Sequence, residues 1–156
     1  MSNDNIDNVN NIDNVNNIDN VNNIDNVNNI DNDIIQYIDR CIFNSSDYDI
    51  ATVCYKYLKD KHRYVKNNVW EYLITYKNGN TIWGIDINNQ HIIYSIKTII
   101  CSAFTKRSLY WSDKKGNSIY TDPELISIKL LHISSKLKDN KYISVLIKEC
   151  KQFFII

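Results

Sequence analysis

Residues 63–87 read RYVKNNVWEYLITYKNGNTIWGIDI, a run of aromatic and β-branched residues broken twice by turn-forming residues. The turn signals are Asn67-Asn68 and Asn78-Gly79-Asn80. The three runs that they separate are therefore predicted to be strands, at 63–66, 69–76 and 81–87. Short connections of this kind join antiparallel neighbours, so the stretch predicts a three-stranded antiparallel meander.

The alternation along the middle strand places Trp70, Tyr72 and Ile74 on one face of the predicted sheet. Trp83 follows on the neighbouring strand. We expect Trp70, Tyr72 and Trp83 to belong to the core first of all, because large aromatic side chains bury the most apolar surface.

Helical patterns lie on both sides of these strands. The clearest has Ile50, Val53, Cys54, Tyr57 and Leu58 at helical spacing, after candidate N-caps at residues 45–47. Similar patterns predict helices at 33–43, 91–104, 123–137 and 141–154. A loop or small hairpin is expected at 109–121, with a turn at 114–117, and the last two helices are expected to form an antiparallel hairpin. The fold class is therefore α+β.

A different kind of sequence precedes this region. NIDNVN occupies residues 5–10 and recurs at 11–16, 17–22 and 23–28, followed by NIDN. Residues 1–39 carry eight aspartates and no basic residue, whereas residues 40–156 carry a net charge of about +8. We expect two parts: residues 1–32 as an acidic low-complexity arm, disordered or weakly helical, and residues 33–156 as one globular domain.

Two other interpretations of the arm stay open. Its period of six residues is typical of left-handed β-helices, although the segment could form barely one coil. Alternatively, an arm of charge −8 could fold back onto the basic domain and compete with nucleic acid.

Catalytic and metal-binding patterns are weak. Asp47 and Asp49 form an Asp-x-Asp pair that could bind a divalent metal in a nuclease, but their place at a helix start favours capping. Cys41, Cys54 and His62 lack zinc-site spacing. The three histidines are expected at the surface or its boundary. All four cysteines are expected to be free thiols in a reducing compartment, and Cys54, Cys101 and Cys150 are expected to be buried. No catalytic residue, metal or cofactor is predicted, and no apolar stretch is long enough to span a membrane.

Basic residues alternate with aromatic ones in the domain. Lysine and arginine can hold phosphates while rings stack on unpaired bases, so this pattern is compatible with nucleic-acid binding. The residues predicted to neutralise phosphates are Lys56, Lys61, Arg63, Lys66, Lys106, Arg107, Lys114 and Lys115.

Two segments carry a family resemblance. SDYDIATVCYKYLKDKHRYVKNNVWEYL at 46–73 resembles the region between primase and helicase in the primase–helicases of nucleo-cytoplasmic large DNA viruses, of the poxvirus and mimivirus type. KLKDNKYISVLIKECKQFF at 136–154 is similar to the helix that precedes the helicase core. The matching positions in the first segment and after it are Asp49, Ala51, Tyr55, Tyr57, Tyr64, Trp70, Tyr72 and Trp83. In the second segment they are Ile147, Lys148, Glu149, Cys150, Phe153 and Phe154.

The resemblance covers residues 46–154 and ends before the ATPase core, so neither a Walker loop nor an arginine finger is included. It implies a non-enzymatic viral protein derived from the connector of a DNA replication primase–helicase, which binds DNA or the replicative helicase. The alternative is a protein-interaction or virion component, or a degenerate relic, without a nucleic-acid role. The implied location is intracellular, in the viral factory of the host cytoplasm or in the virion of a giant virus.

Overall fold

The computed structural model describes residues 24–114 and 122–156, and side chains from residue 32 onward. The predictions for the arm at 1–23 and for most of the turn at 114–117 lie outside the described residues. Six α-helices and three strands are described, with a short 3-10 turn at Ile87–Asn89 and a π-helical turn, η2, at Ile96–Ile100. Their bounds are α1 Ile24–Asn44, α2 Asp47–Leu58, β1 His62–Val65, β2 Val69–Thr75, β3 Thr81–Ile85, α3 Gln90–Ser95, α4 Cys101–Asp113, α5 Pro123–Lys136 and α6 Asn140–Phe154.

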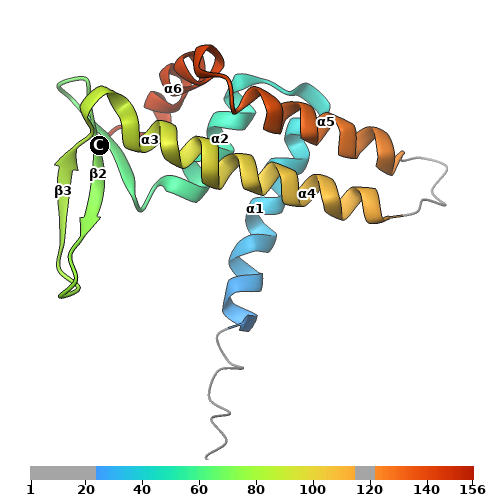
Figure 1. The fold of residues 1–156 in the computed structure, drawn as a ribbon, viewed down its shortest axis with the longest axis horizontal. Helices are drawn as coiled ribbons and strands as arrows, with labels where there is room; N and C mark the ends of the chain where they lie inside the picture. Colours follow the sequence, from blue (N-terminus) through green and yellow to red (C-terminus); the bar gives the residue numbers. More distant parts are fainter. Residues whose placement is uncertain (1–23, 115–121) are drawn as a thin grey trace, which may run out of the picture.

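The α+β class and the meander are confirmed. The strands form one antiparallel sheet in the order β1-β2-β3, which lies at one end of the molecule with the helices to its side (Figure 1). The second turn needs Gly79, whose positive φ lies in the left-handed region that glycine adopts without strain. At the far edge of the sheet, Ile155 continues beside β1 as a parallel bridge to Tyr64.

The inner face of the sheet carries the aromatic core. Trp70 is 2% exposed, and its ring packs between Tyr64 and Phe154 at centroid distances of 5.3 and 5.1 Å. Trp83 was wrongly expected there. It pairs with Leu73, one position away from Tyr72, so the pleat turns it to the outer face. Tyr72 is also only half-buried.

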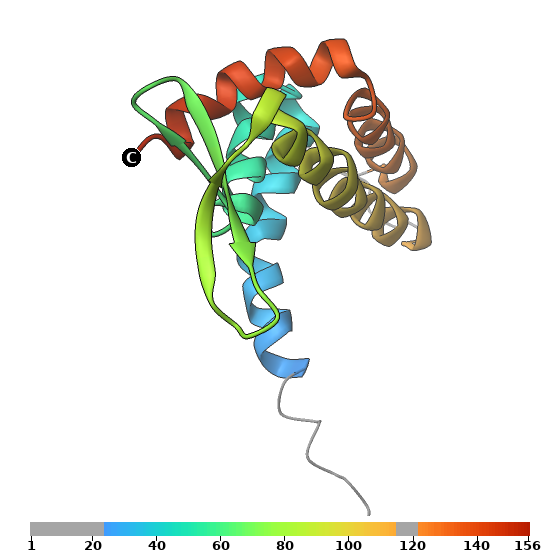
Figure 2. The same ribbon diagram turned by 60° about the vertical axis from the view of Figure 1, so that its left-hand side comes forward.

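Helix α2 is the central helix of the core. Ser46 caps its N-terminus, with the Asp49 amide donating to the Ser46 hydroxyl at 3.1 Å. The helix packs against α1 and against α6. Figure 2 shows the ribbon of the molecule from this side. Five residues of the helix are fully buried. They are Ile50, Ala51, Val53, Cys54 and Leu58.

One continuous helix runs from Gln90 to Asp113, formed by α3, η2 and α4 (Figure 1). The prediction of a loop from residue 109 is therefore wrong for 109–113, which form the end of α4. The buried positions on the core side are four residues apart. They are Ile92, Ile96, Ile100, Phe104 and Ser108. A spacing of four is longer than one turn of a regular helix, so such a stripe drifts around the axis, and the wider π turn between Ile96 and Ile100 compensates part of that drift.

The helical hairpin involves other partners than expected. Helix α5 lies antiparallel beside α4, and this is the most extensive helix contact of the described residues (Figures 1 and 2). Helix α6 instead crosses at a steep angle to α5 and packs on α2. The expected α5–α6 hairpin is thus replaced by an α4–α5 hairpin.

Helix α1 begins at Ile24, nine residues before the predicted start, so its first turns are built from the last repeats. Its C-terminal half packs on α2 through Ile34, Ile38, Cys41 and Ile42, all buried. Its N-terminal half projects away from the domain (Figure 1). A groove forms in the space beside this projecting helix.

Candidate functional site: a groove between helices α1 and α4

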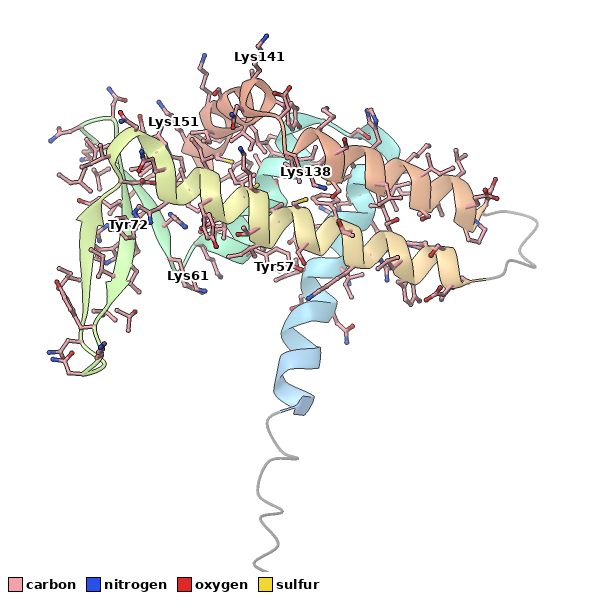
Figure 3. The ribbon with its side chains drawn as sticks, viewed as in Figure 1. Tyr57, Lys61, Tyr72, Lys138, Lys141 and Lys151 are labelled. Atoms are coloured by element: carbon pink, nitrogen blue, oxygen red, sulfur yellow. The ribbon has the colours of Figure 1, made fainter. Side chains whose placement is uncertain are left out.

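A groove of about 810 Å³ lies where α1 leaves the domain and passes the helix formed by η2 and α4. We call it the α1–α4 groove. Its lining residues are Asn32, Ile35, Ile38, Tyr57, Thr98, Ile99, Ser102, Ala103, Lys106, Arg107 and Tyr110. Figure 3 shows Tyr57 below the ribbon of the long helix, close to α1.

The wall on the long helix comes from one stripe of side chains. Thr98, Ser102, Lys106 and Tyr110 follow one another four residues apart, so they line the same side. Thr98 lies in the π-helical turn. The wider winding of that turn keeps the groove-lining stripe next to the buried stripe of the same helix. From Thr98 to Tyr110 the wall is about 18 Å long, at about 1.5 Å per residue.

The floor of the groove is aliphatic and its rim is polar. Ile35 and Ile38 from α1 face Ile99 and Ala103 from the long helix. The hydroxyl groups of Thr98 and Ser102 lie on exposed residues above this floor. Such a combination suits a ligand with an apolar side and a polar side.

The positive end of the groove is organised by Arg107. Its guanidinium group donates two hydrogen bonds to Asp39 of α1, from Nε to Oδ1 at 2.9 Å and from Nη2 to Oδ2 at 2.6 Å. This pairing raises the pKa of Arg107 above its ordinary value, since hydrogen bonding to Asp39 favours the charged form. The same group lies 4.2 Å from the centre of the Tyr110 ring. Arg107 thus joins α1 to α4.

Two lysines differ in their surroundings at this end. Lys114 lies 4.5 Å from the Tyr110 ring centre, and its hydrogen bond lowers the pKa of the Tyr110 phenol, with Arg107 adding to the effect. Lys106 is exposed and has no ionic partner among the described residues. It is therefore the groove's available positive charge.

The other predicted phosphate-binding residues are dispersed. The amine of Lys56, on α2, lies 4.6 Å from the Tyr37 ring centre. Arg63 pairs with Glu71 at 2.6 Å and lies 4.2 Å above Trp83 on the outer sheet face. Lys61 and Lys66 are exposed on either side of β1, and Figure 3 shows Lys61 toward the sheet. Lys115 lies outside the described residues.

The structure therefore brings together only Lys106 and Arg107 in the groove, with Lys114 close by through Tyr110. Both predicted arginines already have carboxylate partners. The aromatic rings of Tyr110 and Trp83 are already covered by cationic groups, which leaves less of each ring for stacking on a base.

The Asp-x-Asp pair has structural contacts. Asp47 accepts a hydrogen bond from the Tyr142 hydroxyl of α6 at 2.8 Å, and Asp49 accepts one from the capping Ser46 at 2.5 Å. Burial and this bond to Asp47 raise the pKa of Tyr142. In the described part of the chain, no three or more His, Cys, Asp or Glu side chains are grouped as metal ligands would be.

All four cysteines are buried and free, which confirms the predicted burial of Cys54, Cys101 and Cys150. Burial, with the nearby charge of Asp49, raises the pKa of the Cys41 thiol to about 12. The pKa of Cys54 is raised by its hydrogen bond with Cys150 and by burial. Both thiols are thus held in the unreactive protonated form.

The histidine predictions hold for two of three positions. His91 and His132 are exposed, whereas His62 is 4% exposed and was wrongly expected at the surface or its boundary. Its Nε2 lies 2.9 Å from the Ser95 hydroxyl, and its Nδ1 has no hydrogen-bond partner among the described residues. The buried Asp86 nearby accepts the amides of His91 and Ile92, both at 2.9 Å, and so caps α3.

Sequence reasoning missed most of the groove. Only its two basic residues were predicted as binding residues, because α1 was expected to be short and the long helix to end near residue 104. The stripe from Thr98 to Tyr110 was visible in the sequence as small and polar residues four apart. Nothing in the sequence indicated that α1 would lie opposite it.

The sequence matches no protein-family model and has no significant match among curated proteins. Within residues 24–114 and 122–156, none of the helices combines the length and apolar character needed to cross a lipid bilayer.

Proposed function

We propose that this protein is a non-enzymatic interaction module, and that the α1–α4 groove receives an acidic segment with aliphatic side chains from a protein partner. The single observation behind this proposal is the composition of the groove: an aliphatic floor beside a wall about 18 Å long, with Lys106, which has no ionic partner among the described residues, on its rim. Amphipathic segments bind grooves of this kind through their apolar side.

A protein partner suits the groove better than nucleic acid does. The floor presents isoleucine and alanine side chains, which pack against aliphatic groups. Bases need aromatic platforms, and of the two tyrosines in the lining, Tyr110 is already covered by Arg107 and Lys114. Arg107 is already paired with Asp39. One lysine gives too few phosphate contacts for appreciable affinity at physiological salt.

The resemblance to the primase–helicase connector supplies the first candidate partner, a viral replicative helicase. The test uses the purified full-length chain and the helicase of the same virus. Ser102 is exposed on the groove wall, so Ser102→Trp should fill the groove without disturbing the core. Ser144→Trp, at an exposed position on α6, is the matched control.

We expect the wild-type chain and Ser144→Trp to bind the helicase equally, and Ser102→Trp to bind at least tenfold more weakly. Calorimetry or surface plasmon resonance would measure the difference. Equal binding by all three chains would exclude the groove as the contact, and no binding by any of them would exclude the helicase as the partner.

DNA binding is the second candidate function, supported by the net charge of residues 40–156. Exposed lysines outside the groove, among them Lys61 and Lys66, would then contact phosphates. A titration of single-stranded DNA at salt concentrations of about 50 and about 200 mM tests this. If several phosphates are contacted, the affinity should fall steeply over that range. An affinity that does not change with salt concentration would contradict such contacts.

A further inference from the structure

We propose that the groove is occupied, in the free protein, by the chain's own acidic repeat arm. The inference rests on the proposed function, because it assumes that the groove accepts an acidic aliphatic segment. The occupant would be one of the two NIDNVN units of residues 5–16, bound in cis. The arm would then act as an internal competitor of the protein partner.

The chemistry of the arm matches the chemistry of the groove. Each repeat offers one isoleucine, one valine and one aspartate, and residues 1–23 contain no basic residue. The two aliphatic side chains suit the floor formed by Ile35, Ile38 and Ile99. The aspartate suits the amine of Lys106 on the rim, which has no ionic partner in the part of the chain that the structure describes.

The dimensions also match. An extended hexapeptide spans about 20 Å, close to the roughly 18 Å between Thr98 and Tyr110. Residues 5–16 contain two identical units that can reach the groove, whereas the unit at 17–22 ends too close to Ile24 to span the distance of about 12 Å to Asn32. This multiplicity favours occupancy without requiring a particular unit.

Because the arm is attached to α1, even a segment with weak intrinsic affinity can fill the groove. The arm joins α1 at Ile24, about 12 Å along the helix axis from Asn32 in the groove lining. At up to about 3.5 Å per residue, the chain between residue 16 and Ile24 can span about 28 Å, which is enough to reach the groove. Tethered segments of this length have millimolar effective concentrations. A segment with a Kd of about 0.1 mM would then fill the groove roughly 90% of the time.

Zero-length cross-linking of the full-length chain with carbodiimide tests the contact. Carboxylates of residues 1–23 should become linked to the amine of Lys106, and the site is mapped by trypsin digestion and tandem mass spectrometry. The absence of basic residues before Arg40 leaves the arm on one fragment, 1–40, whose fragmentation separates links at 1–23 from links at 24–40. Lys129, Lys141 and Lys148, exposed on α5 and α6, serve as reference lysines.

We expect links from the arm to Lys106 at least fivefold more often than to the reference lysines. Ser102→Trp should reduce them about fivefold, while Ser144→Trp leaves them unchanged. Even labelling of all lysines would mean that charge alone attracts the arm, and would overturn the inference. The absence of links, or links insensitive to Ser102→Trp, would overturn it as well.

One further variant and one isotope-mixing experiment separate the alternatives. Replacing Ile6, Val9, Ile12, Val15, Ile18 and Val21 by serine keeps every carboxylate, so persistent links in that chain would contradict apolar binding. Mixing ¹⁵N-labelled and unlabelled chains identifies the donor: cis binding gives no mixed-isotope links, whereas mixed links would assign the groove to the arm of a second copy and overturn the cis contact. If the arm links fail but helicase binding remains sensitive to Ser102→Trp, only this inference falls and the proposed function stands.

Discussion

The stability of the fold should depend on pH through one buried histidine. His62 lies on β1 at the junction with α3, 4% exposed, with Nε2 bonded to Ser95 at 2.9 Å. Burial lowers its pKa from 6.5 to about 4, and the nearby His91 and Lys61 add to this, while Asp86 partly opposes it. The folded state therefore holds His62 in its neutral form.

The sign and size of this pH dependence of the free energy of unfolding follow from proton linkage. Between pH 6.5 and about 4 the unfolded chain binds a proton at this histidine and the folded chain does not, so stability is lost as the pH falls. Above pH 6.5 His62 is mainly neutral in both the folded and the unfolded chain, so no stability is lost there through this histidine. With the two pKa values of 6.5 and about 4, the free energy of unfolding should fall by about 2 kcal/mol between pH 7 and pH 5.

Urea unfolding, followed by tryptophan fluorescence at several pH values from 5 to 7, measures this slope. The window avoids the ordinary titration of carboxylates. His62→Gln should unfold more easily at pH 7 but lose most of the slope, whereas His91→Gln, at an exposed position, should retain it. A wild-type chain whose stability is flat over this window, or a His62→Gln chain with the full slope, would refute the reasoning.

Two further comparisons test the backbone and the helix contacts. Gly79→Ala should lower the free energy of unfolding by about 1 kcal/mol because its φ is positive, a conformation that alanine adopts only with strain. Gly84→Ala should leave that free energy nearly unchanged, since the atom closest to the new Cβ is the flexible end of the Ile74 side chain. Ser108→Ala should cost about 1 kcal/mol by leaving Ser127 unpaired, and the double variant with Ser127→Ala should cost less than the sum of the two single changes. Urea unfolding measures each, and additive costs in the serine pair would contradict the coupling.

The sheet was predictable because its signals are local. Turn residues separate three runs of β-forming residues, and short connections fix the antiparallel order. The face of Trp83 was not predictable in the same way. It depends on the register between β2 and β3, and a shift by one residue moves a side chain to the opposite face. The same pairing places Trp83 opposite Leu73 and above Arg63 instead of beside Trp70.

The sequence pattern did not predict the last turns of the long helix, because the usual placement of apolar residues inside and polar residues outside is inverted there. Ser108 occupies a core position and is 1% exposed, whereas Leu109, which follows it, is 57% exposed. The Ser108 hydroxyl lies 3.0 Å from the carbonyl oxygen of Ser127 and 2.8 Å from its hydroxyl oxygen. These contacts make the buried hydroxyl tolerable, because a buried polar group needs a hydrogen-bond partner. A pattern of apolar residues cannot reveal a core position that is satisfied by a residue on another helix.

The same kind of polar contact explains why α5 joins α4. Thr105 and Ser134 lie with their hydroxyl oxygens 2.8 Å apart, and the Cys101 thiol contacts Ser134 at 3.1 Å. Small side chains of this kind let two helices approach closely while pairing their own polar groups. Sequence order alone favoured α6 as the partner of α5, but α6 has the more apolar stripe and packs on α2 instead.

The groove depends on two departures from the expected fold, namely the extension of α4 past residue 104 and the early start of α1. Helix α4 must continue past residue 104 for Lys106, Arg107 and Tyr110 to lie on one wall, and the serine contacts with α5 hold that extension in place. Helix α1 must begin before residue 33 for Asn32 to join Ile35 in the other wall, which Arg107 fixes through Asp39. The site therefore depends on pairing between segments that are distant in sequence, and for this reason the residues of its floor could not be identified from the sequence.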